Sequence, residues 1–175
     1  FFDPCREFTE CLGMSASVHL SLEQRMKAIG DPAPDFALPD HEGRTVRLSD
    51  LLADGKVVLA FYPADFTPVC TAQACMMRDA HDRLTEAGVR VVAVSPQSRD
   101  SKSRFRKRHN LSQVMLADPD RIAIKAFGVG LPLGLVRRVS FLIDADGTIR
   151  DRVVADFRVA PHKRLLERAS DDARR

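Results

Sequence analysis

The sequence lacks a long hydrophobic run and a strong excess of one charge. No apolar stretch approaches the roughly 20 residues that a membrane-spanning helix needs, so we expect no membrane partner. Lysine and arginine number 27 against 24 acidic residues, a formal net charge of +3, which is too small to favour nucleic acid. A composition that is 45% hydrophobic and 29% charged fits one globular domain with room for a core.

Cysteine is scarce too, and its placement argues against a disulfide scaffold. The four cysteines are Cys5, Cys11, Cys70 and Cys75. A chain of this length with so many apolar residues does not need cross-links to fold. Cys70 and Cys75 lie only five positions apart, which suits redox chemistry better than a structural disulfide. We therefore expect a reducing, cytoplasmic location.

The start of the chain has neither an initial Met nor the basic and then apolar pattern of a secretory signal. We expect residues 1–13 to be an upstream extension, a processed remnant or a gene-boundary artefact. A Pro-Ala-Pro segment at residues 32–34 ends a short lead-in. The predicted organisation is an N-terminal extension over 1–30, a folded domain over 31–170 and a frayed tail over 171–175.

Apolar runs separated by turn residues predict alternating strands and helices. The predicted strands are 57–61, 89–94, 114–116, 139–143 and 149–154, with a hairpin over 35–48; the predicted helices are 49–52, 67–86, 98–109, 121–127 and 161–168. Asp144-Ala145-Asp146-Gly147 predicts a tight turn between the last two strands. This order indicates an α/β fold with a central mixed β-sheet, helices on both faces and an N-terminal hairpin.

The most informative segment directly follows the strand predicted at residues 57–61. Thr67 is a favoured N-cap and Pro68 suits the first helical position, so a helix is predicted to begin there. Cys70 then falls in the first turn, where unpaired N–H groups and the helix dipole stabilise a thiolate. Open α/β sheets carry their sites at the carboxyl ends of strands. We therefore expect Cys70 to be a reactive thiol.

The spacing of Pro63, Thr67 and Cys70 resembles the Pro-x3-Thr-x2-Cys motif of peroxiredoxins. The segment from Phe61 to Asp79 is similar to the peroxiredoxin Q, or bacterioferritin co-migratory protein, group, whose resolving cysteine lies five positions after the peroxidatic one. The segment 138–147, Arg-Val-Ser-Phe-Leu-Ile-Asp-Ala-Asp-Gly, resembles the one that carries the family's active-site arginine. The resemblance spans about residues 31–168 and implies a thioredoxin-like fold and thiol peroxidase activity.

The resemblance also implies a role for each site residue. Cys70 is expected to attack the peroxide, and Arg138, which cannot lose its proton, to hold the thiolate and polarise the bound peroxide. The Thr67 hydroxyl and the backbone N–H groups of Val69 and Cys70 are expected to contact the same substrate. Pro63 is expected to shield the thiolate from water.

Cys75 is the resolving cysteine that the resemblance implies. On an intact α-helix, Cα atoms five residues apart are separated by about 8–9 Å, beyond the limit of about 7 Å for a disulfide. We therefore expect the first turns of the helix to unwind when Cys70 and Cys75 are joined.

Simpler interpretations of these residues stay open at this stage. Cys75 could be a small apolar residue on a helix face, and Gln73 either a neighbour of the arginine or a surface residue. Arg138 could be an ordinary strand cation, and its neighbour Arg137 could take its place. Residues 129–137 form a shorter loop than is usual in the family, so substrate access or an oligomer surface could differ.

Other charged and histidine-rich features have simple explanations. The basic run Arg99–His109 lacks interleaved aromatic residues and predicts a solvated helix face rather than a nucleic-acid site. His41, His109 and His162 are expected at the surface. No cofactor is expected, because Cys5, Cys11, His19 and His81 match no compact zinc pattern.

The expected substrates are hydrogen peroxide and organic hydroperoxides, and the expected reductant is thioredoxin or a similar dithiol, with the protein a monomer or weak homodimer. A thioredoxin-type thiol–disulfide oxidoreductase is less favoured, because the spacing is Cys-x4-Cys rather than Cys-x2-Cys. A non-catalytic, chaperone-like protein on the same fold would leave Pro63, Thr67 and Arg138 without a purpose.

Overall fold

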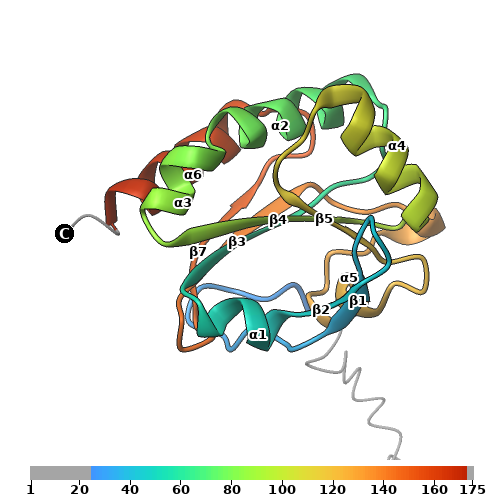
Figure 1. Cartoon of the computed structure of the whole chain (residues 1–175). Helices are drawn as coiled ribbons and strands as arrows, with labels where there is room; N and C mark the ends of the chain where they lie inside the picture. The colour runs from blue at the N-terminus through green and yellow to red at the C-terminus, as the bar shows by residue number, and fades with distance from the viewer. Residues whose placement is uncertain (1–24, 173–175) are drawn as a thin grey trace, which may run out of the picture.

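The computed structural model describes residues 25–172, and its centre is a five-stranded sheet of order β5-β4-β3-β6-β7 (Figure 1). The strands are β3 (Lys56–Phe61), β4 (Val89–Ser95), β5 (Val114–Ala117), β6 (Val139–Ile143) and β7 (Ile149–Val154). β3, β4 and β5 are parallel, whereas β6 runs antiparallel to both β3 and β7. The α/β fold with a central mixed sheet that the sequence predicts is therefore confirmed.

A small hairpin precedes the sheet, as predicted. It pairs β1 (Ala37–Pro39) with β2 (Thr45–Arg47) in antiparallel register. The Asp40 carboxylate shapes the turn, because its Oδ1 accepts hydrogen bonds from the backbone N–H groups of Glu42 and Arg44 at 2.8 and 2.9 Å. Helix α1 (Leu48–Ala53) follows directly.

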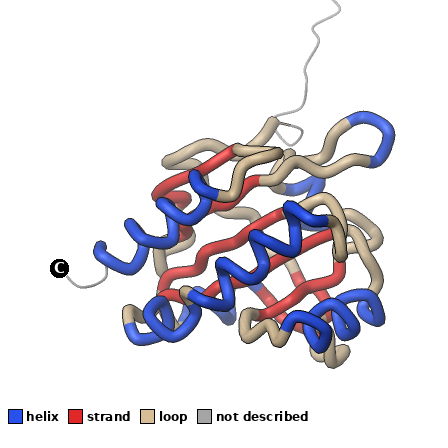
Figure 2. Tube along the Cα trace, turned by 90° about the horizontal axis from the view of Figure 1, so that it is seen from above, coloured by secondary structure: helices blue, strands red, loops and turns tan. Residues whose placement is uncertain are grey.

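Helices cover both faces of the sheet (Figures 1 and 2). One face carries α2 (Pro68–Asp79), α3 (His81–Glu86), α4 (Arg99–His109) and α6 (Ala160–Asp172), and the other carries α1, α5 (Ile122–Ala126) and the hairpin. The single helix predicted over 67–86 is wrong, because α2 ends at Asp79 and a new helix begins at His81. The closing helix is longer than predicted and includes residues 171 and 172.

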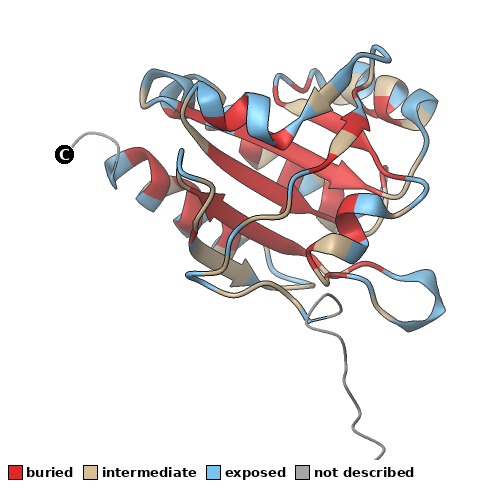
Figure 3. Ribbon diagram, turned by 90° about the horizontal axis from the view of Figure 1, so that it is seen from below, coloured by how far each residue is buried: buried red, intermediate tan, exposed pale blue. Residues whose placement is uncertain are grey.

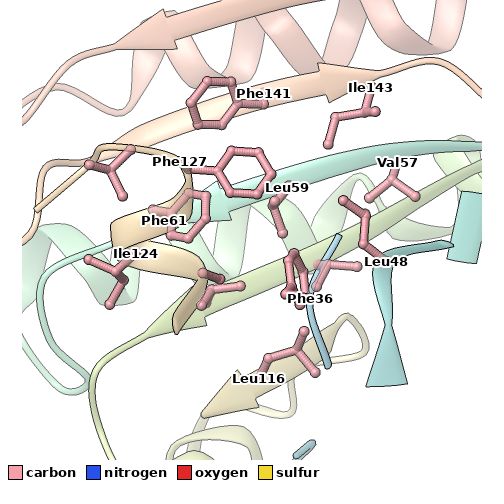
Figure 4. Packing of buried hydrophobic residues seen from close by; sticks show 14 of the residues in the cluster. Phe36, Leu48, Val57, Leu59, Phe61, Leu116, Ile124, Phe127, Phe141 and Ile143 are labelled. Carbon is pink, nitrogen blue, oxygen red and sulfur yellow. The ribbon is translucent and has the colours of Figure 1, made fainter. Parts of the chain in front are cut away.

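Strand β3 is buried on both of its faces, which explains its unbroken run of apolar residues. Its odd-numbered residues face an aromatic cluster in which the rings of Phe61 and Phe141 each lie 5.2 Å from that of Phe127 (Figure 4). Its even-numbered residues pack under α2, α3 and α6 against Met77 and Leu165, and Figure 3 shows the sheet buried throughout its centre. Burying one such side chain contributes about 1.5–3 kcal/mol, so the strand that leads into the site is firmly anchored.

The first described residues join this domain through the backbone. The N–H of Lys27 donates to the Phe127 carbonyl at 3.0 Å, and that of Gly30 donates to the Ile149 carbonyl at 2.8 Å. Most of the predicted extension over 1–30, with Cys5, Cys11 and His19, lies outside the described residues, as do residues 173–175 of the predicted tail. Within residues 25–172, none of the helices has the length and apolarity to cross a membrane.

Candidate active site

Cys70 lies in the first turn of α2, just beyond the carboxyl end of β3. Thr67 occupies the N-cap position with extended backbone (φ −76°, ψ 149°), and Pro68 takes the first helical position, as the sequence predicts. The Cys70 residue is 2% exposed, and its thiol is free. A buried cysteine at the amino end of a helix has N–H dipoles directed toward a negatively charged sulfur.

Arg138 supplies a positive charge at the same point. It directly precedes β6, where Val139 pairs with Phe61 at the end of β3, so the sheet register brings it to Cys70. Its guanidinium Nη2 donates to the Cys70 Sγ at 3.1 Å, and the residue is 2% exposed. Of the two adjacent arginines, Arg137 and Arg138, it is Arg138 that makes this contact with Cys70.

Two further residues hold that guanidinium. Gln73, one turn beyond Cys70 on α2, is 2% exposed, and its Oε1 accepts from Arg138 Nη1. The Asp156 carbonyl accepts from Arg138 Nε at 3.0 Å, and the Asp156 carboxylate accepts from the Arg138 backbone N–H at 2.9 Å. Of the two interpretations of Gln73, the structure supports the one beside the arginine. The sequence does not predict the role of Asp156, because only its long-range contacts with Arg138 reveal it.

The loop before α2 carries Pro63 and Thr67. The Thr67 hydroxyl donates to the Ala64 carbonyl at 3.3 Å and does not cap the helix with its side chain. Its oxygen lone pairs therefore stay available to accept a hydrogen bond. The Pro63 carbonyl accepts from Gln97 Nε2 at 3.4 Å. Pro63 and Val69 are both partly buried, while Thr67 is exposed.

Cys75 lies on the same helix as Cys70 and has a free, partly buried thiol. Both cysteines belong to the continuous segment Pro68–Asp79. Ideal helix geometry therefore keeps their Cα atoms about 8–9 Å apart. A bond between the two sulfurs requires a change in the backbone of α2.

A buried polar cluster lies behind the start of α2. One of its members comes from α4, for which the sequence predicts only a solvated basic face. Lys102 of α4 is fully buried and donates to the carboxylate of Asp65 at 2.9 Å and to the hydroxyl of Tyr62 at 2.8 Å. Burial lowers the pKa of Lys102 to about 8, against the attraction of Asp65. Burial and the Asp65 charge raise the pKa of Tyr62 well above its usual value. The expectation that the whole run Arg99–His109 is solvated is therefore wrong at Lys102.

His162 of α6 is also buried, contrary to the surface position expected from the sequence. Its Nδ1 and the Ser140 hydroxyl are 2.8 Å apart, and its Nε2 lies 3.2 Å from the Ala155 carbonyl. Burial lowers the pKa of His162, and the nearby Arg138 charge acts in the same direction. His162 therefore packs as a neutral ring behind the strand that leads from Arg138.

The short loop at residues 129–137 contains a 3-10 turn, Pro132–Gly134. The Arg121 guanidinium fixes it by donating to the carbonyls of Gly134 and Leu135 at 2.7 and 2.8 Å. Leu133 at its tip is 97% exposed. Across residues 25–172, no three His, Cys, Asp or Glu side chains are grouped so that they could hold a metal ion.

The fold and the buried cysteine–arginine pair fit a thiol-dependent peroxidase. Comparison with known proteins agrees: the model of the AhpC/TSA family matches residues 29–152. The chain belongs to this family.

Its relatives also support the resemblance to the peroxiredoxin Q group. Peroxiredoxin Bcp of Escherichia coli is 41% identical over 140 residues, covering 76% of this chain and 88% of that protein. Peroxiredoxin Bcp of Bacillus subtilis is 39% identical over 129 residues, covering 69% and 81%. The crystal structure of peroxidoxin BcpB from Mycobacterium tuberculosis is 35% identical, covers 85% of this chain and 98% of that one, and superposes with a TM-score of 0.78.

Proposed function

We propose that Cys70 is the nucleophile of this peroxidase. The carrying observation is the 3.1 Å contact between Arg138 Nη2 and the Cys70 sulfur, with both residues 2% exposed. The thiolate attacks the nearer peroxide oxygen, the O–O bond breaks, and the distal oxygen leaves as hydroxide or alkoxide and takes up a proton. The sulfur becomes a sulfenic acid. A fixed guanidinium favours both the thiolate and the developing negative oxygen.

The residues around Cys70 have supporting roles in this step. The Thr67 hydroxyl already donates to the Ala64 carbonyl, so its oxygen is free to accept from the peroxide. The backbone N–H groups of Val69 and Cys70 belong to the first turn of α2, where no earlier carbonyl of the helix is available to accept them. Pro63 limits the access of water to the thiolate. Hydrogen peroxide and organic hydroperoxides are the substrates of this site.

Cys75 resolves the oxidised enzyme. Its thiolate attacks the sulfenic sulfur of Cys70, an S–S bond forms as the S–O bond breaks, and the oxygen leaves as hydroxide, which takes up a proton to give water. Because both cysteines belong to one continuous helix, this step needs the first turns of α2 to unwind. The enzyme then alternates between a helical reduced form and a locally unwound disulfide form.

A cytoplasmic dithiol protein of thioredoxin type reduces the disulfide by thiol–disulfide exchange. The exposed basic side chains of α4, Arg104, Lys107 and Arg108, lie with Phe66 around a surface hollow, beside the helix that must unwind. This charge suits an acidic face on the reductant. The enzyme is a monomer or weak homodimer.

Stopped-flow reaction with hydrogen peroxide tests the assignment. In Cys70→Ser, all rapid consumption of peroxide should be lost. In Cys75→Ser, the first oxidation should survive while turnover with thioredoxin fails, and mass spectrometry should find a Cys70 sulfenic acid instead of a Cys70–Cys75 disulfide. Rapid peroxide consumption by Cys70→Ser would refute the proposal.

Hydrogen exchange tests the unwinding. Amide protection over residues 67–77 should fall in the oxidised protein and return on reduction. Strands β3 and β6 supply the internal control, since their protection should be the same in both forms. Equal protection of residues 67–77 in the two redox states would contradict the mechanism.

A further inference from the structure

The loop between β3 and α2 is fixed by a buried ion pair that the peroxidase chemistry does not use. The side chains of Lys102 and Asp65 are 0% and 1% exposed, and Lys102 Nζ lies 2.9 Å from Asp65 Oδ1. Tyr62 donates its hydroxyl to the same oxygen at 2.6 Å. Ser101 donates to the other carboxylate oxygen, Oδ2, at 2.6 Å. Both oxygens of this buried carboxylate are therefore satisfied.

The cluster joins three elements that are distant in the sequence. Asp65 belongs to the loop after β3, Ser101 and Lys102 to α4, and Ser95, whose hydroxyl accepts from Lys102 Nζ, to the end of β4. The Lys102 ammonium also lies 4.6 Å from the centre of the Tyr62 ring. The loop before α2 is thereby attached to the sheet and to the neighbouring helix.

Phe66, the residue after Asp65, has an unusual backbone conformation. Phe66 has φ of 64°, in the left-handed region that a bulky side chain seldom adopts. Such a conformation persists only where its surroundings enforce it. Asp65 is fixed on one side, and on the other the ring of Phe66 packs edge to face on Phe105 at 5.1 Å. The strained residue leads directly into Thr67, the N-cap of α2.

The ion pair is also within electrostatic reach of the reactive sulfur. A negative charge on Cys70 raises the pKa of both Lys102 and Tyr62, and such an attraction or repulsion is mutual. The charged groups that face Cys70 are Arg138, directly before β6, and, behind the helix start, Lys102 with its counter-charge Asp65. Asp156 and the neutral ring of His162 lie behind Arg138.

We propose that the Lys102–Asp65 pair is a positioning brace for Cys70: it fixes the strained turn from which α2 starts, and it cancels its own charge so that Arg138 alone sets the field at the sulfur. This rests on the proposed function in one respect, that Cys70 is the reacting thiol. The brace holds the helical reduced form, and Asp65 is the fixed end about which the first turns unwind.

Three variants test the brace: Lys102→Met, Asp65→Asn and the double variant. Lys102→Met leaves a buried carboxylate that repels the thiolate, whereas Asp65→Asn leaves an ammonium that attracts it. The readout is the rate of Cys70 alkylation by iodoacetamide against pH, measured by peptide mass spectrometry, which needs no peroxidase activity. Lys125→Met on α5 and Asp50→Asn on α1 are matched controls, because both residues are exposed and lie on the opposite face of the sheet.

The midpoint of the pH profile should rise in Lys102→Met and fall in Asp65→Asn, each by roughly half a unit or more, and should return close to wild type in the double variant. Amide exchange at residues 67–71 of the reduced protein should be at least several-fold faster in both single variants. Both controls should match wild type.

A pair with only a structural role would move the two midpoints in the same direction or not at all, and either result overturns the proposal. The double variant guards against misfolding, because it buries no unpaired charge; a double variant that shifts as far as a single one also overturns it. Hydrogen peroxide reactivity of the wild-type protein, measured separately, shows whether the proposed function itself fails.

Discussion

Replacing Arg138 with Met should slow the reaction of Cys70 with peroxide by about 10- to 150-fold. The side chain is 2% exposed, and its Nη2 donates to the Cys70 sulfur at 3.1 Å. A hydrogen bond to a charged group contributes about 1.5–3 kcal/mol, and each 1.4 kcal/mol or so changes a rate tenfold. Met has a similar length but no donor and no charge, so the thiolate and the leaving oxygen lose this contact together.

The measurement is stopped-flow mixing with hydrogen peroxide in a Cys75→Ser background, which isolates the first oxidation. Arg137→Met is the matched control, since Arg137 is the adjacent arginine and is only partly buried. It should react at nearly the wild-type rate. A loss below about threefold in Arg138→Met, or an equal loss in both variants, would refute the reasoning.

A loss of stability has to be separated from this loss of rate. Without the guanidinium, the Gln73 Oε1 and the Asp156 carbonyl lose their donors, and each buried unpaired group costs about 1–3 kcal/mol. Thermal unfolding of Arg138→Met, followed by circular dichroism, identifies a temperature at which the variant is folded. Arg138→Lys retains the charge but not the planar fork, so it should recover part of the rate.

Three further outcomes are expected. Burial lowers the pKa of His162 below 6.5, so in acid the unfolded state takes up a proton more readily than the folded state does. Wild-type stability should therefore fall as the pH drops below about 6.5. Thermal melts of His162→Asn should show a weaker dependence on pH in that range. Lys107→Glu with Arg108→Glu should raise the KM for an acidic thioredoxin several-fold and weaken its salt dependence, while the rate with dithiothreitol stays the same. Phe127→Ala should lower the free energy of unfolding in urea by about 3–5 kcal/mol, because this fully buried ring packs against three others.

Signals carried by neighbouring residues predict several strand and helix bounds correctly. The unbroken apolar runs and the Asp-Gly turn give the bounds of β6 and β7, and Thr67 with Pro68 marks the start of α2. The break at Ala80 is different. It involves no Gly or Pro, and the backbone at Ala80 stays near the helical region (φ −93°, ψ −5°), so the usual helix-breaking residues do not mark it.

No pattern of neighbouring residues predicts the buried polar contacts around the site. Lys102 belongs to a run of basic residues that predicts a solvated helix face, and its partner Asp65 lies 37 positions earlier. Arg138 and Asp156 are 18 positions apart. Such pairs form only when the sheet brings distant segments together. The resemblance to a known family supplies Arg138, but nothing in the sequence predicts its contact with Asp156 or the Lys102–Asp65 pair.

Tyr62 gives this protein an optical property of its own. The chain contains one tyrosine and no tryptophan, so fluorescence excited at wavelengths beyond the phenylalanine absorption band comes from a single known position. That phenol donates to the Asp65 carboxylate at 2.6 Å, and a carboxylate in this position quenches tyrosine fluorescence by accepting the excited-state proton. Rearrangement of the loop between β3 and α2 would change the brightness of the whole molecule. The tyrosine fluorescence of the unlabelled protein can therefore be used to follow this rearrangement.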